Sequence, residues 1–151
     1  MKTTFDILLL QGFGELKFGQ TIEDTINQMG DAEEIDHLDT DDQMNTIVLH
    51  YWDQETSIFF EGVSKTVLSC FETDNPDAVL FGKKVFEMKP DEVKSLMAEH
   101  GYATPEEEEE EGELRITYED ALVDFFYDGE ELLAVNWGVL VNEAGEIETD
   151  E

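Results

Sequence analysis

The sequence predicts an α+β protein made of two tandem units, each a helix followed by an antiparallel meander, with the helices packed on one side of the sheets. The chain has 151 residues, of which 40% are hydrophobic and 11% aromatic, so it can bury a core despite a formal charge of −31. A pattern of apolar and aromatic residues also occurs twice. Because each copy spans about 60 to 70 residues, the pattern indicates a duplication and not a solenoid of short repeats.

The two copies are clearest in segments 51–62 (YWDQETSIFFEG) and 118–129 (YEDALVDFFYDG), which share the same spacing of aromatic residues. Two shorter segments, 16–19 (LKFG) and 79–82 (VLFG), each precede a helical pattern. The predicted parts of the chain are therefore a first unit over 1–75, a second unit over 76–140 and an acidic tail over 141–151.

Each unit is expected to begin with a short amphipathic helix. Thr21 is placed to cap the first helix and Gly30 to end it, since a hydroxyl favours the N-cap and glycine the C-terminal position. Pro90 suits the first position of the second helix, which Gly101 ends. Both helices carry an apolar stripe at helical spacing, made of Ile22, Ile26 and Met29 in the first and Val93, Leu96, Met97 and His100 in the second.

Alternating apolar runs predict the strands, and Asp128-Gly129 predicts a hairpin turn between the last two. The predicted strands are 47–52, 57–61 and 66–72 in the first unit and 114–118, 123–127 and 132–137 in the second. Because successive side chains alternate, Trp52 is expected on the sheet face opposite Tyr51. Trp52 and Trp137 either anchor a partner on an open sheet face or fill the groove between the two units.

Three acidic blocks, 31–42, 105–113 and 143–151, hold 19 of the 39 acidic residues and are predicted to be solvated loops and a tail. Such blocks serve either solubility or the binding of a partner. The strong negative charge predicts that nucleic acid and anionic membranes are repelled and that a basic protein surface is attracted.

The chain carries no pattern typical of an enzyme, a cofactor site or a metal site. Cys70 lies in an apolar run and is expected to be an inert core thiol, and no spacing marks a histidine as a catalytic base. The first acidic block offers carboxylates for weak Ca²⁺ binding but lacks the glycine and the distal glutamate of an EF-hand loop. A single cysteine excludes an internal disulfide, and the apolar run 7–10 is too short for a signal peptide or a membrane span, so a cytoplasmic location is expected.

The segments LQGFGELKFGQTIEDTINQMG, AVLFGKKVFEMKPDEVKSLM and LLAVNWGV resemble a group of small acidic bacterial immunity proteins, which neutralise a toxin. The duplicated helix-plus-meander pattern also resembles the architecture of the β-lactamase inhibitory protein, which blocks its target with a sheet surface. This resemblance covers residues 7–140 and implies a two-unit fold and a protein partner, with no catalytic residues.

These observations together predict an immunity-type protein that binds and occludes a basic toxin, with a nuclease as one candidate target. The residues expected to contact the partner are Asp36, Asp39, Asp41, Asp42, Tyr51, Trp52 and Trp137. The alternative is an acidic housekeeping or regulatory protein whose charge serves solubility or salt adaptation.

Overall fold

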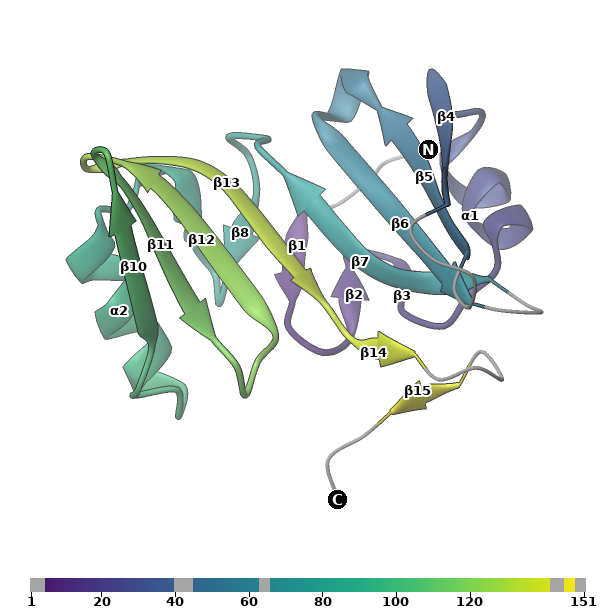
Figure 1. Cartoon of the computed structure of the whole chain (residues 1–151). Helices are drawn as coiled ribbons and strands as arrows, with labels where there is room; N and C mark the ends of the chain where they lie inside the picture. The colour runs from purple at the N-terminus through teal and green to yellow at the C-terminus, as the bar shows by residue number, and fades with distance from the viewer. Residues whose placement is uncertain (1–4, 40–44, 63–65, 142–145, 149–151) are drawn as a thin grey trace.

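A computed structural model describes residues 5–39, 45–62, 66–141 and 146–148. Over these residues the chain is an α+β protein with two α-helices and three β-sheets (Figure 1). The α-helices are α1 (Ile22–Met29) and α2 (Pro90–Glu99). Within this described part, neither helix has the length and apolar character needed to cross a membrane.

The largest sheet has eight antiparallel strands in the order β10-β11-β12-β13-β7-β6-β5-β4. Its strands are β4 (Glu34–Asp39), β5 (Asn45–Tyr51), β6 (Thr56–Gly62), β7 (Val67–Thr73), β10 (Glu106–Glu110), β11 (Glu113–Tyr118), β12 (Val123–Asp128) and β13 (Glu131–Gly138). One meander, β4 to β7, follows α1 in the chain, and the other, β10 to β13, follows α2. The last strands of the two meanders, β7 and β13, pair with each other and make the sheet continuous.

A smaller mixed sheet with the strand order β3-β2-β1-β8-β9 lies behind the centre of the large sheet, and α1 and α2 lie on the same side (Figure 1). Its strands are β1 (Asp6–Leu8), β2 (Gly12–Phe13), β3 (Leu16–Lys17), β8 (Val79–Leu80) and β9 (Lys83–Lys84). The remaining elements are β14 (Leu140–Val141) and β15 (Ile147–Glu148), which pair, and two 3₁₀ turns, η1 (Trp52–Gln54) and η2 (Val85–Glu87).

The structure confirms the local signals that were expected to start and end the helices. The Thr21 hydroxyl oxygen accepts a hydrogen bond from the Asp24 backbone N–H at 3.1 Å, and Gly30 follows α1 with φ 86°. Pro90 is the first residue of α2, where its missing N–H costs no helical hydrogen bond. His100 differs from the expectation, because it is exposed and stacks on Phe81 with 3.7 Å between ring centroids.

The prediction that the acidic blocks are loops is wrong for 34–39 and 106–110, which form the two outermost strands of the large sheet. Backbone pairing to one neighbour organises each segment, and the glutamate side chains of 106–110 are exposed. Lys94 pairs with Glu107 at 2.9 Å and Arg115 with Glu108 at 2.8 Å, which reduces the repulsion along β10. Charged edge strands also discourage pairing with the edge of another molecule.

The two meanders share irregularities at corresponding positions. The β6–β7 pairing shifts register between Phe59 and Phe60, and the β12–β13 pairing shifts between Phe126 and Tyr127. The turn before β6 contains Glu55 with φ 53°, and the turn before β12 contains Leu122 with φ 52°. Both are non-glycine residues in the left-handed region, which is uncommon outside turns.

One hydrophobic core extends across both meanders, α2 and the small sheet. At its centre, Trp137 of β13 contacts Phe13 and Phe71, with ring centroids 5.0 and 5.3 Å away. The Trp137 indole N–H donates to the backbone carbonyl of Gly12 at 3.0 Å, joining the small sheet to the centre of the large one. The boundary predicted at residue 75 therefore does not separate two cores.

Candidate binding face

The large sheet has one face toward the core, and none of the described helices lies in front of its other face, which is toward the viewer in Figure 1. We call the second one the open face. Alternation along the strands and the pairing registers assign its members. Its acids are Glu34, Asp36, Glu61, Glu72, Glu106, Glu108, Glu110, Glu113, Asp124, Asp128 and Glu131; its other large side chains are Val48, His50, Phe59, Arg115, Phe126 and Leu133.

Polar side chains on the open face form a row that crosses all eight strands. Residues directly opposite one another along this row are Glu106, Thr117, Asp124, Asn136, Glu72, Ser57, His50 and Glu34. Hydrogen bonds join several neighbours: the Thr117 hydroxyl donates to Asp124, and the Asn136 amide donates to Glu72 at 3.4 Å. The face is therefore an ordered polar surface with aromatic side chains beside it.

Of the aromatic residues expected at the binding surface, only Trp52 is accessible. Its side chain is 51% exposed, whereas Tyr51 is 1% exposed and Trp137 is fully buried. The Tyr51 hydroxyl donates to the Gly30 carbonyl at 2.8 Å and so fixes the end of α1 against the sheet. Tyr51 and Trp137 are core residues, and the prediction that they contact a partner is corrected. Trp137 instead packs against Phe13 and Phe71 in the core.

The four aspartates expected to meet a partner do not all fall in the described structure. Asp36 lies on β4 and its side chain is 44% exposed on the open face. Asp39 is the last residue of β4. Asp41 and Asp42 lie outside the described residues. Asp36 and Trp52 both contact His50, and Glu34 lies directly opposite His50 on β4.

His50 organises the surface around Trp52. Its ring stacks on the Trp52 indole with 4.4 Å between centroids and an interplanar angle of 12°. Its Nδ1 atom lies 2.8 Å from the Ser57 hydroxyl oxygen, and its Nε2 atom lies 2.8 Å from an Asp36 carboxylate oxygen. These contacts hold the imidazole from both sides, and the stacked imidazole in turn supports one face of the exposed indole.

A hollow of about 260 Å³ lies beside Trp52 at the junction of the two meanders. Its lining includes Trp52, Ser57 and Glu72 from the first meander and Ala134 from β13. An exposed indole next to a carboxylate and a small hollow can receive a basic or amphipathic side chain, because Trp faces attract cations and aromatic anchors dominate interfaces.

Cys70 was expected in the core, but it lies on the open face next to Phe59. Its thiol donates to the Asn136 side-chain oxygen at 3.2 Å. Burial, with a smaller effect from Glu61 and Glu72, raises the pKa of Cys70 to about 12. The thiolate form that a nucleophile needs is therefore disfavoured near neutral pH.

The sequence did not single out His50, Ser57 or Glu72 as parts of a site. The register of β4, β5, β6 and β7 brings them together, and only the alternation of apolar residues in each strand hinted at their shared face.

Comparisons with known proteins found no matching family model, no matching curated protein and no matching solved structure.

Proposed function

We propose that this chain is an immunity-type or inhibitory protein that uses the open face to bind and occlude a basic protein partner, such as a toxin that acts on nucleic acid. The observation that carries this proposal is the separation of the described basic residues from the open face. Acids occupy the open face of most strands of the large sheet, and Arg115 is the single Lys or Arg described on that face. The described lysines lie on the small sheet or at α2: Lys17, Lys83, Lys84, Lys89 and Lys94.

This separation favours a basic partner. A surface of one sign steers an oppositely charged protein and raises its association rate. Enzymes that bind nucleic acid present Lys and Arg to phosphate groups, so an acidic surface competes for the same site. Trp52, half exposed and stacked on His50, supplies the rigid aromatic anchor that such an interface needs at its centre.

The dimensions of the face suit a stable complex. Eight strands spaced about 4.8 Å apart span about 34 Å, and strands of five to eight residues are about 20 Å long, which gives a face of about 700 Å². A standard interface buries about 800 Å² on each partner. The open face is therefore large enough to form most of one side of such an interface.

We also infer that the two meanders, each with its preceding helix, are diverged copies of one unit. The matching register shifts, the matching left-handed residues Glu55 and Leu122, and the central pairing of β7 with β13 support this inference. Two copies placed side by side give a face twice as broad as one meander provides. A broad sheet surface fits occlusion of a partner better than recognition of a small molecule.

A second candidate function is a housekeeping or regulatory role in which the acids serve solubility or salt adaptation. The side chains of β10, a run of exposed glutamates at the edge of the sheet, favour this alternative because they protect that edge without any partner. The two functions differ in which acidic residues they require. Partner binding depends on the open face, whereas solubility depends on total charge.

The test is capture of a basic protein from the source cells by the immobilised chain, repeated with two pairs of charge-reversed variants. Glu72→Lys with Asp128→Lys changes the open face, and Glu23→Lys with Glu99→Lys changes exposed positions on the helices by the same total charge. We expect the first pair to abolish capture and the second to retain it. Trp52→Ala should weaken binding by about 2 kcal/mol, a factor of about 30. Equal loss in both pairs, or no captured protein, contradicts the proposal.

A further inference from the structure

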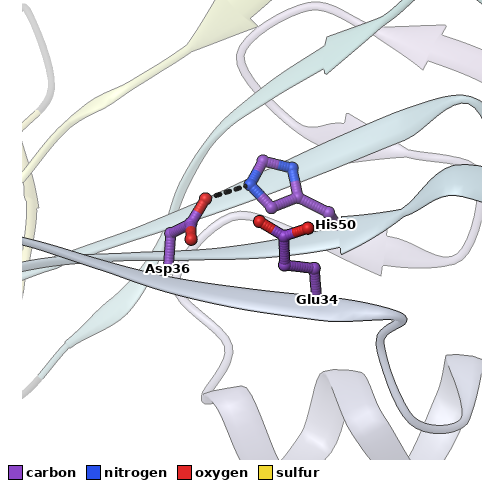
Figure 2. Close-up of side chains that lie close together, drawn as sticks. All are labelled: Glu34, Asp36 and His50. Carbon is purple, nitrogen blue, oxygen red and sulfur yellow. Dashed lines mark hydrogen bonds and ion pairs between the residues drawn. The ribbon is translucent and has the colours of Figure 1, made fainter.

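We infer that Glu34, Asp36 and His50 form a binding site for a divalent transition-metal ion of the Zn²⁺ type at the β4–β5 end of the open face. Figure 2 shows the three side chains converging from two paired strands. Each offers one ligand atom, and these atoms all lie within 4.8 Å of one another. The inference concerns the isolated chain and does not depend on the proposed partner.

The pairing of β4 with β5 creates this convergence. Glu34 and Asp36 are two residues apart on β4, so their side chains leave the same face of the strand. Glu34 lies directly opposite His50 in the antiparallel register. Because all three residues belong to hydrogen-bonded strands, the backbone fixes the distances between their Cα atoms before any ion binds.

Small side-chain movements are enough to form a metal site. Zinc bonds to nitrogen and carboxylate oxygen are about 2.0 to 2.2 Å long, so ligand atoms around a tetrahedral ion lie about 3.4 Å apart. The Asp36 oxygen and His50 Nε2 are 2.8 Å apart and need to separate slightly, whereas the widest separation in the cluster, within 4.8 Å, needs to close by at most about 1.4 Å. The exposed Glu34 side chain can supply that movement by rotation.

His50 distinguishes this cluster from the many acidic groups elsewhere on the surface. Its Nδ1 atom contacts the Ser57 hydroxyl at 2.8 Å, and its ring is stacked on Trp52, so Nε2 is held pointing at the two carboxylates. A histidine that binds a metal almost always has its other ring nitrogen hydrogen-bonded in this way, which fixes the ring orientation and the tautomer. When an ion replaces the proton on Nε2, the remaining imidazole proton lies on Nδ1 and donates to Ser57.

The charges and atom types favour a transition metal. Among the described residues, neither Glu34 nor Asp36 forms an ion pair with a lysine or arginine, so two negative charges face the imidazole without a basic side chain to balance them. One nitrogen and two oxygen ligands match Zn²⁺ and similar ions, whereas Ca²⁺ and Mg²⁺ prefer oxygen ligands alone. Three protein ligands leave the fourth position to water or to a ligand from another molecule.

The test is titration of the chain with ZnCl₂ by calorimetry in physiological salt. Excess Mg²⁺ is present to occupy surface carboxylates that bind cations nonspecifically. We expect one saturable Zn²⁺ site in the wild type. His50→Gln and Glu34→Gln should each weaken Zn²⁺ binding at least tenfold. His37→Gln is the matched control, because His37 is an exposed histidine on β4 that faces away from the cluster, and it should bind Zn²⁺ like the wild type.

Thermal unfolding gives an independent readout, because an ion that binds only the folded chain raises its melting temperature. Zn²⁺ should raise the melting temperature of the wild type and of His37→Gln but not that of Glu34→Gln. Glu34 is exposed, so its replacement leaves folding intact even if His50→Gln does not fold. Absence of a saturable Zn²⁺ site in the wild type, or equal binding by Glu34→Gln and His37→Gln, overturns the inference.

Discussion

Replacing Trp137 by phenylalanine tests the role of this residue as the link between the two sheets. The Trp137 side chain is fully buried, and its indole N–H donates to the Gly12 carbonyl at 3.0 Å. Phenylalanine keeps an aromatic ring beside Phe13 and Phe71 but removes the donor and part of the ring volume. The substitution therefore separates the hydrogen bond and the close packing from simple apolar burial.

The expected loss of stability has two parts. Leaving the buried Gly12 carbonyl without this donor costs about 1 to 3 kcal/mol. The missing volume, about 40 Å³ at about 24 cal/mol per Å³, adds about 1 kcal/mol. We therefore expect the free energy of unfolding to fall by about 2 to 4 kcal/mol, and the urea midpoint to fall by about 1 to 2 M for a slope near 2 kcal/mol/M.

Urea unfolding followed by circular dichroism measures this change. Trp52→Phe is the matched control, because Trp52 is 51% exposed and makes no comparable buried hydrogen bond among the described contacts. We expect the control to stay within about 0.5 kcal/mol of the wild type. A Trp137→Phe variant as stable as the control refutes the assignment of Trp137 as the core link.

Three further predictions concern individual side chains. Burial, then the charges of Asp31 and Glu33, raises the pKa of Tyr51 to about 12. The neutral phenol therefore stabilises the fold fully below about pH 10, and this stabilisation is lost as the pH rises through 12. Urea unfolding should show a smaller loss of stability over this pH range in Tyr51→Phe than in the wild type. Because the pKa of Cys70 is raised, iodoacetamide near pH 9 should alkylate the folded chain at least about tenfold more slowly than the urea-unfolded chain; equal rates contradict this. Ser57→Ala should weaken Zn²⁺ binding about 10- to 100-fold, because it removes the hydrogen bond that orients His50. The melting temperature of the metal-free chain should change by no more than a few degrees. Unchanged Zn²⁺ affinity in calorimetry excludes a role for the Ser57 hydroxyl in metal binding.

Local sequence signals predicted the parts of the fold that depend on neighbouring residues. The Thr21 cap, the Pro90 start and the Asp128-Gly129 hairpin each act within a few residues, and the structure confirms all three. The edge strands β4 and β10 were missed because their like-charged side chains resemble solvated loops. Their strand conformation depends on pairing with β5 and β11, which lies outside the local pattern.

The candidate site was only partly predictable for the same reason. Alternation correctly placed Trp52 opposite Tyr51, but it could not show that the small sheet covers Trp137, because β1 to β3 and β8 to β9 assemble from distant parts of the chain. The contact of His50 with Asp36 and Ser57 depends on the register of three strands. A shift of one residue in either pairing would send these side chains to opposite faces.

Carboxylate labelling of the complex with a captured basic partner shows which acidic side chains the partner covers. A carbodiimide and an amine modify accessible Asp and Glu side chains, and mass spectrometry measures each site with and without the partner. The proposed binding mode predicts protection of Glu72, Glu113 and Asp128 on the open face and unchanged labelling of Glu23 and Glu99 on the helices. Protection of the helix sites with continued labelling of the open face would contradict it.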